Sequence, residues 1–197
     1  MTTRYPKITL LAAAVLLTGC AHNAAVPQLR HQVAALNQKV SVLTDQATAL
    51  ERQNQLNQHS DNGVYLLPAA RSAARLQSGI GELSVSLSHI KSEANGAQAQ
   101  LHMRILSQAT LPPFKAVVEW GQLDAATGRP LTAEALSQPI ASADSLLPKP
   151  GQDFELRFSG LTPEQLGYIR LHSLVATAQP AGGAATLKSE AKKKERR

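Results

Sequence analysis

The chain has 197 residues, and 20 Lys or Arg against 14 Asp or Glu give it a formal net charge of +6. The excess lies at the ends, because residues 1–19 hold two bases and no acid, residues 176–197 hold six bases and two acids, and the twelve bases and twelve acids between them cancel. A neutral central region argues against a basic nucleic-acid-binding fold. A single cysteine excludes an internal disulfide framework and a cysteine-rich zinc site.

Residues 1–19 are typical of an export signal. Arg4 and Lys7 precede the apolar run 8–17, which as a helix would cover only about 15 Å, roughly half of a hydrocarbon core. The four residues that end this region resemble the lipobox of bacterial lipoproteins, namely Leu17, Thr18, Gly19 and Cys20. The alternative is an ordinary cleaved signal followed by an incidental cysteine.

The lipobox resemblance implies a chemical role for Cys20. Its thiol is alkylated by a diacylglyceryl group, the chain is cut before it, and its new amino group takes a further acyl chain. Two or three acyl chains hold a protein on a membrane, whereas one holds it only marginally. The residue after the cysteine is Ala21 rather than Asp, and this resembles the sorting signal of lipoproteins that are sent to the outer membrane. We therefore expect a lipid-anchored protein of the bacterial envelope that faces the periplasm, with residues 20–27 as a short lipidated leash.

Residues 28–60 predict a coiled-coil-type helix. Apolar residues recur at alternating spacings of four and three, and Asn54 and Asn57 continue the spacing with polar side chains. An Asn at an a position would help to fix the register of such a helix. His59 and the residues up to Gly63 end the helix. The apolar seam consists of Leu29, Val33, Leu36, Val40, Leu43, Ala47 and Leu50.

The seam leaves two interpretations open. A stripe of two residues in seven is narrow for a helix of a globular domain, which favours self-association. β-Branched residues at a with Leu at d favour a parallel dimer, although the weakly charged flanking positions leave a trimer open. The alternative is a single amphipathic helix that folds back on its own domain.

From about residue 64 the spacing becomes alternating, which predicts strands. Turn residues such as Asn95-Gly96 and Pro112-Pro113 separate the segments. Short connections favour antiparallel pairing, and one apolar face per strand favours two packed sheets. We predict a mainly β fold, an antiparallel β-sandwich over residues 64–175. The clear strands are 83–87, 101–105, 114–120, 154–158 and 168–175.

Two segments of this domain need separate interpretation. Within 131–147, residues 132–135 fit a helical turn, and residues 138–140 fit the start of an edge strand. Thr162 and Pro163 predict a single helical turn before Tyr168. A Leu-x-Pro leading to a Tyr at a strand start resembles the tyrosine corner of immunoglobulin-like sandwiches, with the Tyr one residue late, so that topology stays an alternative.

Four segments of the domain carry a family resemblance, and they are 65–68, 76–81, 118–122 and 165–172. They resemble the YajI-like lipoproteins, a bacterial family built on a domain of unknown function. The segments span nearly all of residues 64–175, and the lipobox agrees with them. The resemblance implies an envelope lipoprotein, and it supplies no activity and no site residue.

The sequence offers few residues for chemistry. His89, His102 and His172 fall in strand regions and could bind zinc if they converged, but their spacing predicts separate surface residues. Trp120 shares the parity of Phe114, which indicates core packing rather than a ligand platform. No Gly-x-Ser-x-Gly or phosphate-binding glycine loop occurs.

Residues 176–197 predict a disordered basic tail, because they hold too few apolar residues to fold. Such a tail either solvates the chain or touches anionic phosphates at a membrane surface.

We therefore predict a non-enzymatic envelope lipoprotein that is anchored through Cys20 and acts as an oligomerising or scaffolding protein. Its predicted partners are the membrane, further copies of itself and an unidentified envelope protein, with no cofactor, metal or nucleic acid. The alternative is a ligand- or peptide-binding periplasmic module, which requires a pocket or an open sheet edge. An envelope enzyme would require converging side chains such as the three strand histidines.

Overall fold

The computed structural model describes residues 25–142 and 149–177. The predicted signal, Cys20 and nearly all of the predicted tail lie outside the described residues. The chain divides into two compact units, Met1–Asp45 and Gln46–Arg197.

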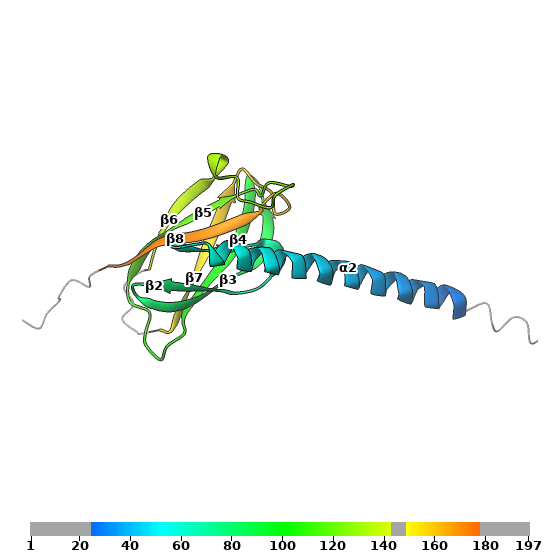
Figure 1. Ribbon diagram of the computed structural model, residues 1–197, viewed down its shortest axis with the longest axis horizontal. Helices are drawn as coiled ribbons and strands as arrows, with labels where there is room; N and C mark the ends of the chain where they lie inside the picture. The colour runs from blue at the N-terminus through cyan, green and yellow to red at the C-terminus, as the bar shows by residue number, and fades with distance from the viewer. Residues whose placement is uncertain (1–24, 143–148, 178–197) are drawn as a thin grey trace, which may run out of the picture. The chain divides into compact units, whose positions relative to one another are not determined.

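One long α-helix, α2, spans Ala25–Gln58 and continues across the boundary between the two units (Figure 1). The predicted helix at 28–60 is thus confirmed, with both ends earlier by two or three residues. Pro27 lies within the first turn, where its missing N–H leaves no helical hydrogen bond unmade. Among the described helices, none is long and apolar enough to cross a membrane.

The strands form two four-stranded sheets whose strand pairs are all antiparallel. One sheet has the order β1-β8-β5-β6 and the other β2-β3-β4-β7, and Figure 1 shows them as two layers. The strands are β1 (Gly63–Leu66), β2 (Ala74–Ser78), β3 (Gly81–Glu93), β4 (Gly96–Ile105), β5 (Phe114–Gly121), β6 (Leu136–Ala141), β7 (Gly151–Ser159) and β8 (Tyr168–Ala176).

The core lies between the two sheets, as alternation predicts for a sandwich. Along β5, Phe114, Ala116, Val118 and Trp120 are all buried, and the residues between them face outward. The Trp120 ring packs edge-on against Phe158 of β7, with centroids 5.4 Å apart. Trp120 is therefore a core residue, as its parity predicts.

All five predicted strands are present, and the ambiguous segment contains both expected elements. A 3-10 turn, η2, spans Thr132–Glu134, and β6 follows as an edge strand with Pro139 inside it. The predicted strands do not include β1 and β2, because each has only two inward apolar residues, Val64 with Leu66 and Ala74 with Leu76. A second 3-10 turn, η1 (Pro68–Ala70), joins these two strands.

The sandwich is confirmed, but the immunoglobulin-like alternative is not what the chain adopts. The sheets of a constant-type immunoglobulin domain have the orders ABED and CFG, in which no three consecutive strands are neighbours, whereas β2, β3 and β4 form a meander here. The Tyr168 hydroxyl donates to Glu119 Oε1 at 3.0 Å rather than to nearby upstream backbone, so it forms no tyrosine corner. The helical turn before it is present, since Leu166 N–H donates to Thr162 O at 3.0 Å.

Candidate functional site

The N-terminal part of α2 exposes the predicted seam. Every side chain from Val26 to Asp45 is exposed in the single chain. The exposed fractions of the seam residues remain high for apolar side chains: Leu29 61%, Val33 50%, Leu36 60%, Val40 54% and Leu43 64%. Isolated exposed apolar residues are common, but a row of five at heptad spacing is typical of a protein interface.

From Gln46 onward the helix packs against the sandwich with a face that overlaps the seam only in part. Ala49 is buried with Leu67, Ala70 and Tyr168, and Leu50 packs beside them half-buried. The last two seam residues therefore differ in burial. Leu50 packs against this cluster, whereas Ala47 is exposed. The folded-back interpretation therefore holds for the C-terminal part of the helix.

Amide side chains attach this part of the helix to strand β1, an edge strand of its sheet. Asn57 Oδ1 accepts from Tyr65 N–H at 2.6 Å, and Asn57 Nδ2 donates to Tyr65 O at 3.0 Å. Gln53, which is fully buried, accepts the Leu67 N–H through Oε1 at 2.8 Å. The helix thus satisfies backbone groups that an edge strand otherwise leaves unpaired.

This contact involves one of the two polar residues at the end of the seam, Asn57. Asn54, predicted at an a position that would fix coiled-coil register, is exposed, while its neighbour Gln53 is buried. Asn57 therefore continues the heptad spacing at a position that binds the edge of a sheet, and a role of Asn54 in coiled-coil register stays a prediction.

The outer face of the β1-β8-β5-β6 sheet carries a group of polar side chains around Glu119. Tyr168 donates to one carboxylate oxygen of Glu119, and His172 Nε2 lies 3.9 Å from the other. Burial and the Glu119 hydrogen bond raise the pKa of Tyr168, so its hydroxyl stays protonated. Burial, and then the Arg170 guanidinium, lower the pKa of His172 below its usual 6.5. Arg170 also lies over the Tyr65 ring, 5.2 Å from its centroid.

The outer face of the other sheet brings three residues into the connectivity of a Ser-His-Asp triad. Ser88 lies on β3, His102 on β4 and Asp153 on β7, three strands that are neighbours in the sheet. Ser88 Oγ is hydrogen-bonded to His102 Nε2, and His102 Nδ1 lies 2.7 Å from Asp153 Oδ1. His102 and Asp153 are direct partners across the β4–β7 ladder, and Ser88 lies diagonal to His102.

The strand that carries Ser88 is irregular at this point. The β3–β4 register shifts between Ser88 and Lys91, so His89 and Ile90 oppose only Ala99. His89 adopts a left-handed φ of 52°, which is uncommon for a residue with a side chain. Its Nδ1 lies 2.8 Å from Ser88 Oγ, so two histidines approach one hydroxyl.

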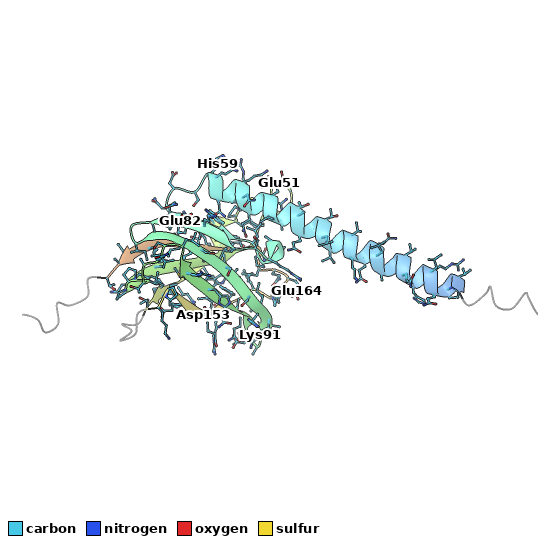
Figure 2. The ribbon with its side chains drawn as sticks, turned by 90° about the horizontal axis from the view of Figure 1, so that it is seen from below. Glu51, His59, Glu82, Lys91, Asp153 and Glu164 are labelled. Atoms are coloured by element: carbon cyan, nitrogen blue, oxygen red, sulfur yellow. The ribbon has the colours of Figure 1, made fainter. Side chains whose placement is uncertain are left out.

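A shallow depression of about 250 Å³ opens beside the bulge. Figure 2 labels Lys91, which lines it, and Asp153 of the same sheet. Five of its six lining residues carry polar side chains, and the lining consists of His89, Lys91, Gln98, Ala99, Gln100 and Glu155. Such a surface can contact a small polar molecule.

Spacing along the chain does not predict this group. The prediction that the three strand histidines lie apart is wrong for His89 and His102, which both approach Ser88 Oγ, whereas His172 lies on the other sheet. Within residues 25–142 and 149–177, no three His, Cys, Asp or Glu side chains are placed to hold a metal ion. The lipobox residues 17–19 and Cys20 lie outside the described part of the chain.

Comparison with known proteins identifies relatives over most of the chain. A family model described as "Protein of unknown function (DUF3251)" matches residues 20–182. The "Uncharacterized lipoprotein YajI" of Escherichia coli (strain K12) is 34% identical over 179 residues, which cover 91% of this chain and all of that protein.

Two solved structures are also similar. The solution NMR structure of the E. coli lipoprotein YajI matches with a TM-score of 0.63 and 32% identity, over 72% of this chain and 84% of that one. The trimeric lipoprotein SadB of Salmonella enterica matches with a TM-score of 0.49 and 17% identity, over 86% and 90% of the two chains. At that level its trimeric state says nothing about this chain. The first three matches agree with the resemblance predicted from the strand segments, and the chain belongs to the family of YajI-like lipoproteins.

Proposed function

We propose that the protein is a lipid-anchored envelope protein that self-associates through the exposed part of α2 and presents its sandwich to the periplasm. The anchor is Cys20, with Leu17, Thr18 and Gly19 as the recognition sequence before it. The description of its relative YajI as a lipoprotein supports the anchor. Ala21 supports an outer-membrane location.

The observation that carries the self-association is the row of five exposed seam residues from Leu29 to Leu43. Heptad spacing places them on one stripe, where a second helix can bury them as knobs into holes. They precede Gln46 and therefore belong to the unit Met1–Asp45.

The size of this interface predicts a weak association in solution. Burying a Leu or Val from about half exposure contributes roughly 1 kcal/mol, so ten such residues in a dimer contribute roughly 10 kcal/mol. Association of two chains costs about 4–15 kcal/mol, which nearly cancels this gain. Anchoring on one membrane raises the effective concentration of the helices, and therefore favours the dimer or trimer there.

The test replaces seam residues with lysine. Leu36→Lys with Leu43→Lys places two like charges at the d positions of the interface. His31→Lys with Gln38→Lys adds the same two side chains at f positions, one heptad apart on the opposite face. Crosslinking in proteoliposomes and sedimentation in mild detergent should show oligomers for the natural chain and the control, and monomers for the seam variant.

Equal oligomer yields for the two double variants would refute the seam. The anchor is tested separately with Cys20→Ala, which should leave the membrane fraction for the soluble fraction on cell lysis. Membrane retention equal to that of the natural chain would refute the anchor without bearing on the seam.

A further inference from the structure

We propose that Ser88, His102 and Asp153 form an acyl-transfer site that hydrolyses small carboxylic esters, with Ser88 as the nucleophile. This goes beyond membrane anchoring and self-association, and it departs from the expectation of a non-enzymatic protein. It stands on the connectivity of the three side chains, the bulge beside Ser88 and the depression next to it.

The hydrogen bonds give each side chain one role. A carboxylate only accepts, so the 2.7 Å contact with Asp153 fixes the proton of His102 on Nδ1. The neutral imidazole then presents the lone pair of Nε2, which faces Ser88 Oγ. Nε2 is therefore the base that takes the hydroxyl proton, and Asp153 is a positioning residue that sets the tautomer.

The bulge supplies donors for the oxygen on which negative charge develops. β2 pairs with β3 only as far as Val85, so beyond this residue β3 has a neighbour on one side. His89 and Ile90 stand outside the regular β4 register directly after the nucleophile. Their backbone N–H groups, which stand outside the regular register, are assigned as the donors that would stabilise an oxyanion, and the His89 ring contacts Ser88 Oγ itself at 2.8 Å.

The site is open to substrate. The side chain of His102 is 33% exposed and that of Asp153 is 58% exposed, and Ser88 is half-buried. The depression of about 250 Å³ accommodates a short acyl chain rather than a long one. Lys91, Gln98 and Gln100 in its lining suit a polar alcohol portion of the ester.

The reaction consumes only the ester and one water molecule. Ser88 Oγ attacks the ester carbonyl carbon while His102 Nε2 takes the hydroxyl proton. Collapse breaks the bond from that carbon to the alkoxy oxygen, the alcohol leaves with the proton from Nε2, and an acyl-Ser88 ester remains. Water, deprotonated by the same Nε2, attacks this ester, and the carboxylic acid leaves as Ser88 recovers its proton.

The first experiment treats the detergent-solubilised full chain with a fluorophosphonate probe and locates the adduct by mass spectrometry. We expect the label on Ser88. Hydrolysis of p-nitrophenyl acetate should fall at least about 100-fold in Ser88→Ala and His102→Gln, the size of a general-base contribution. In Asp153→Asn, kcat should fall while KM stays the same, which a merely structural role would not produce.

The controls remove one serine and one histidine side chain that lie outside the proposed site. Ser84→Ala changes a serine on the same strand and face that pairs with Arg75 and Arg104, and His172→Gln changes a histidine of the other sheet. Both should keep the labelling and the rate. An unlabelled Ser88, or a Ser88→Ala rate within twofold of the natural rate, overturns the proposal and leaves the three residues as a cross-strand hydrogen-bond ladder.

Discussion

The contact of α2 with strand β1 depends on Gln53, and Gln53→Glu tests it sharply. The side chain is fully buried, its Oε1 accepts the Leu67 N–H at 2.8 Å, and its Nε2 has no partner among the described residues. A glutamate has the same shape and can accept the same N–H. It also places a negative charge where water does not reach.

The magnitude follows from the cost of burying that charge. A carboxyl pKa raised by two to three units, within the range of buried carboxylates, corresponds to about 3–4 kcal/mol. The folded state then binds the proton more tightly than the unfolded state, whose pKa is about 4.3. The loss of unfolding free energy is therefore complete above the raised pKa, near neutral pH, and disappears as the pH falls towards 4.

Equilibrium urea unfolding reports this loss through the fluorescence of Trp120, the single tryptophan and a buried core residue. Asn54→Asp is the matched control, because it makes the same amide-to-carboxylate change at the next, exposed residue, and should stay within about 0.5 kcal/mol. The reasoning is wrong if Gln53→Glu matches the natural chain at pH 7.5, or if its deficit grows on acidification.

Two further predictions concern the polar group around Glu119. Tyr168→Phe removes the hydroxyl that donates to Glu119 and should lower the unfolding free energy by about 1.5–3 kcal/mol, whereas Tyr65→Phe, whose hydroxyl has no hydrogen bond among the described residues, should lower it by less than about 1 kcal/mol. The lowered pKa of His172 means that the unfolded state binds the proton more readily, so stability should decrease as the pH falls through 6.5 towards that lowered value, and His172→Gln should flatten this part of the pH profile. If the unfolding free energies of His172→Gln and of the natural chain depend identically on pH between 7.5 and 5, the second prediction is contradicted.

The fold was largely predictable because its signals are local. Alternation over eight or more residues, as in β3, β4 and β5, identifies a strand and its inward face without knowledge of the partner strand. The short strands β1 and β2 each contain only two inward apolar residues, which are too few to establish an alternation. Their positions are set by partners far along the chain, since β1 pairs with β8.

The Ser88 group could not be predicted, because its parts meet only through strand register. His102 lies 14 residues after Ser88, and Asp153 lies 51 residues after His102. Alternation indicates that each of the three side chains points outward from its strand. It does not give the register between strands, and a shift of one residue in the β3–β4 or β4–β7 ladder would turn one of the three side chains to the core. The bulge after Ser88 also has no sequence signal, since the left-handed position is occupied by His89 rather than by glycine.

The change of residue type along α2 has a physical reason that heptad spacing alone conceals. Up to Leu43 the seam is apolar, as a helix–helix interface requires. Where the helix meets an edge strand, it faces backbone N–H and C=O groups, and each buried one left unpaired costs about 1–3 kcal/mol. Asn57 satisfies a backbone N–H and a backbone C=O, and Gln53 satisfies a backbone N–H, so both stabilise this contact where leucines would not. Polar residues at the end of a heptad stripe therefore indicate contact with a sheet edge as well as control of coiled-coil register.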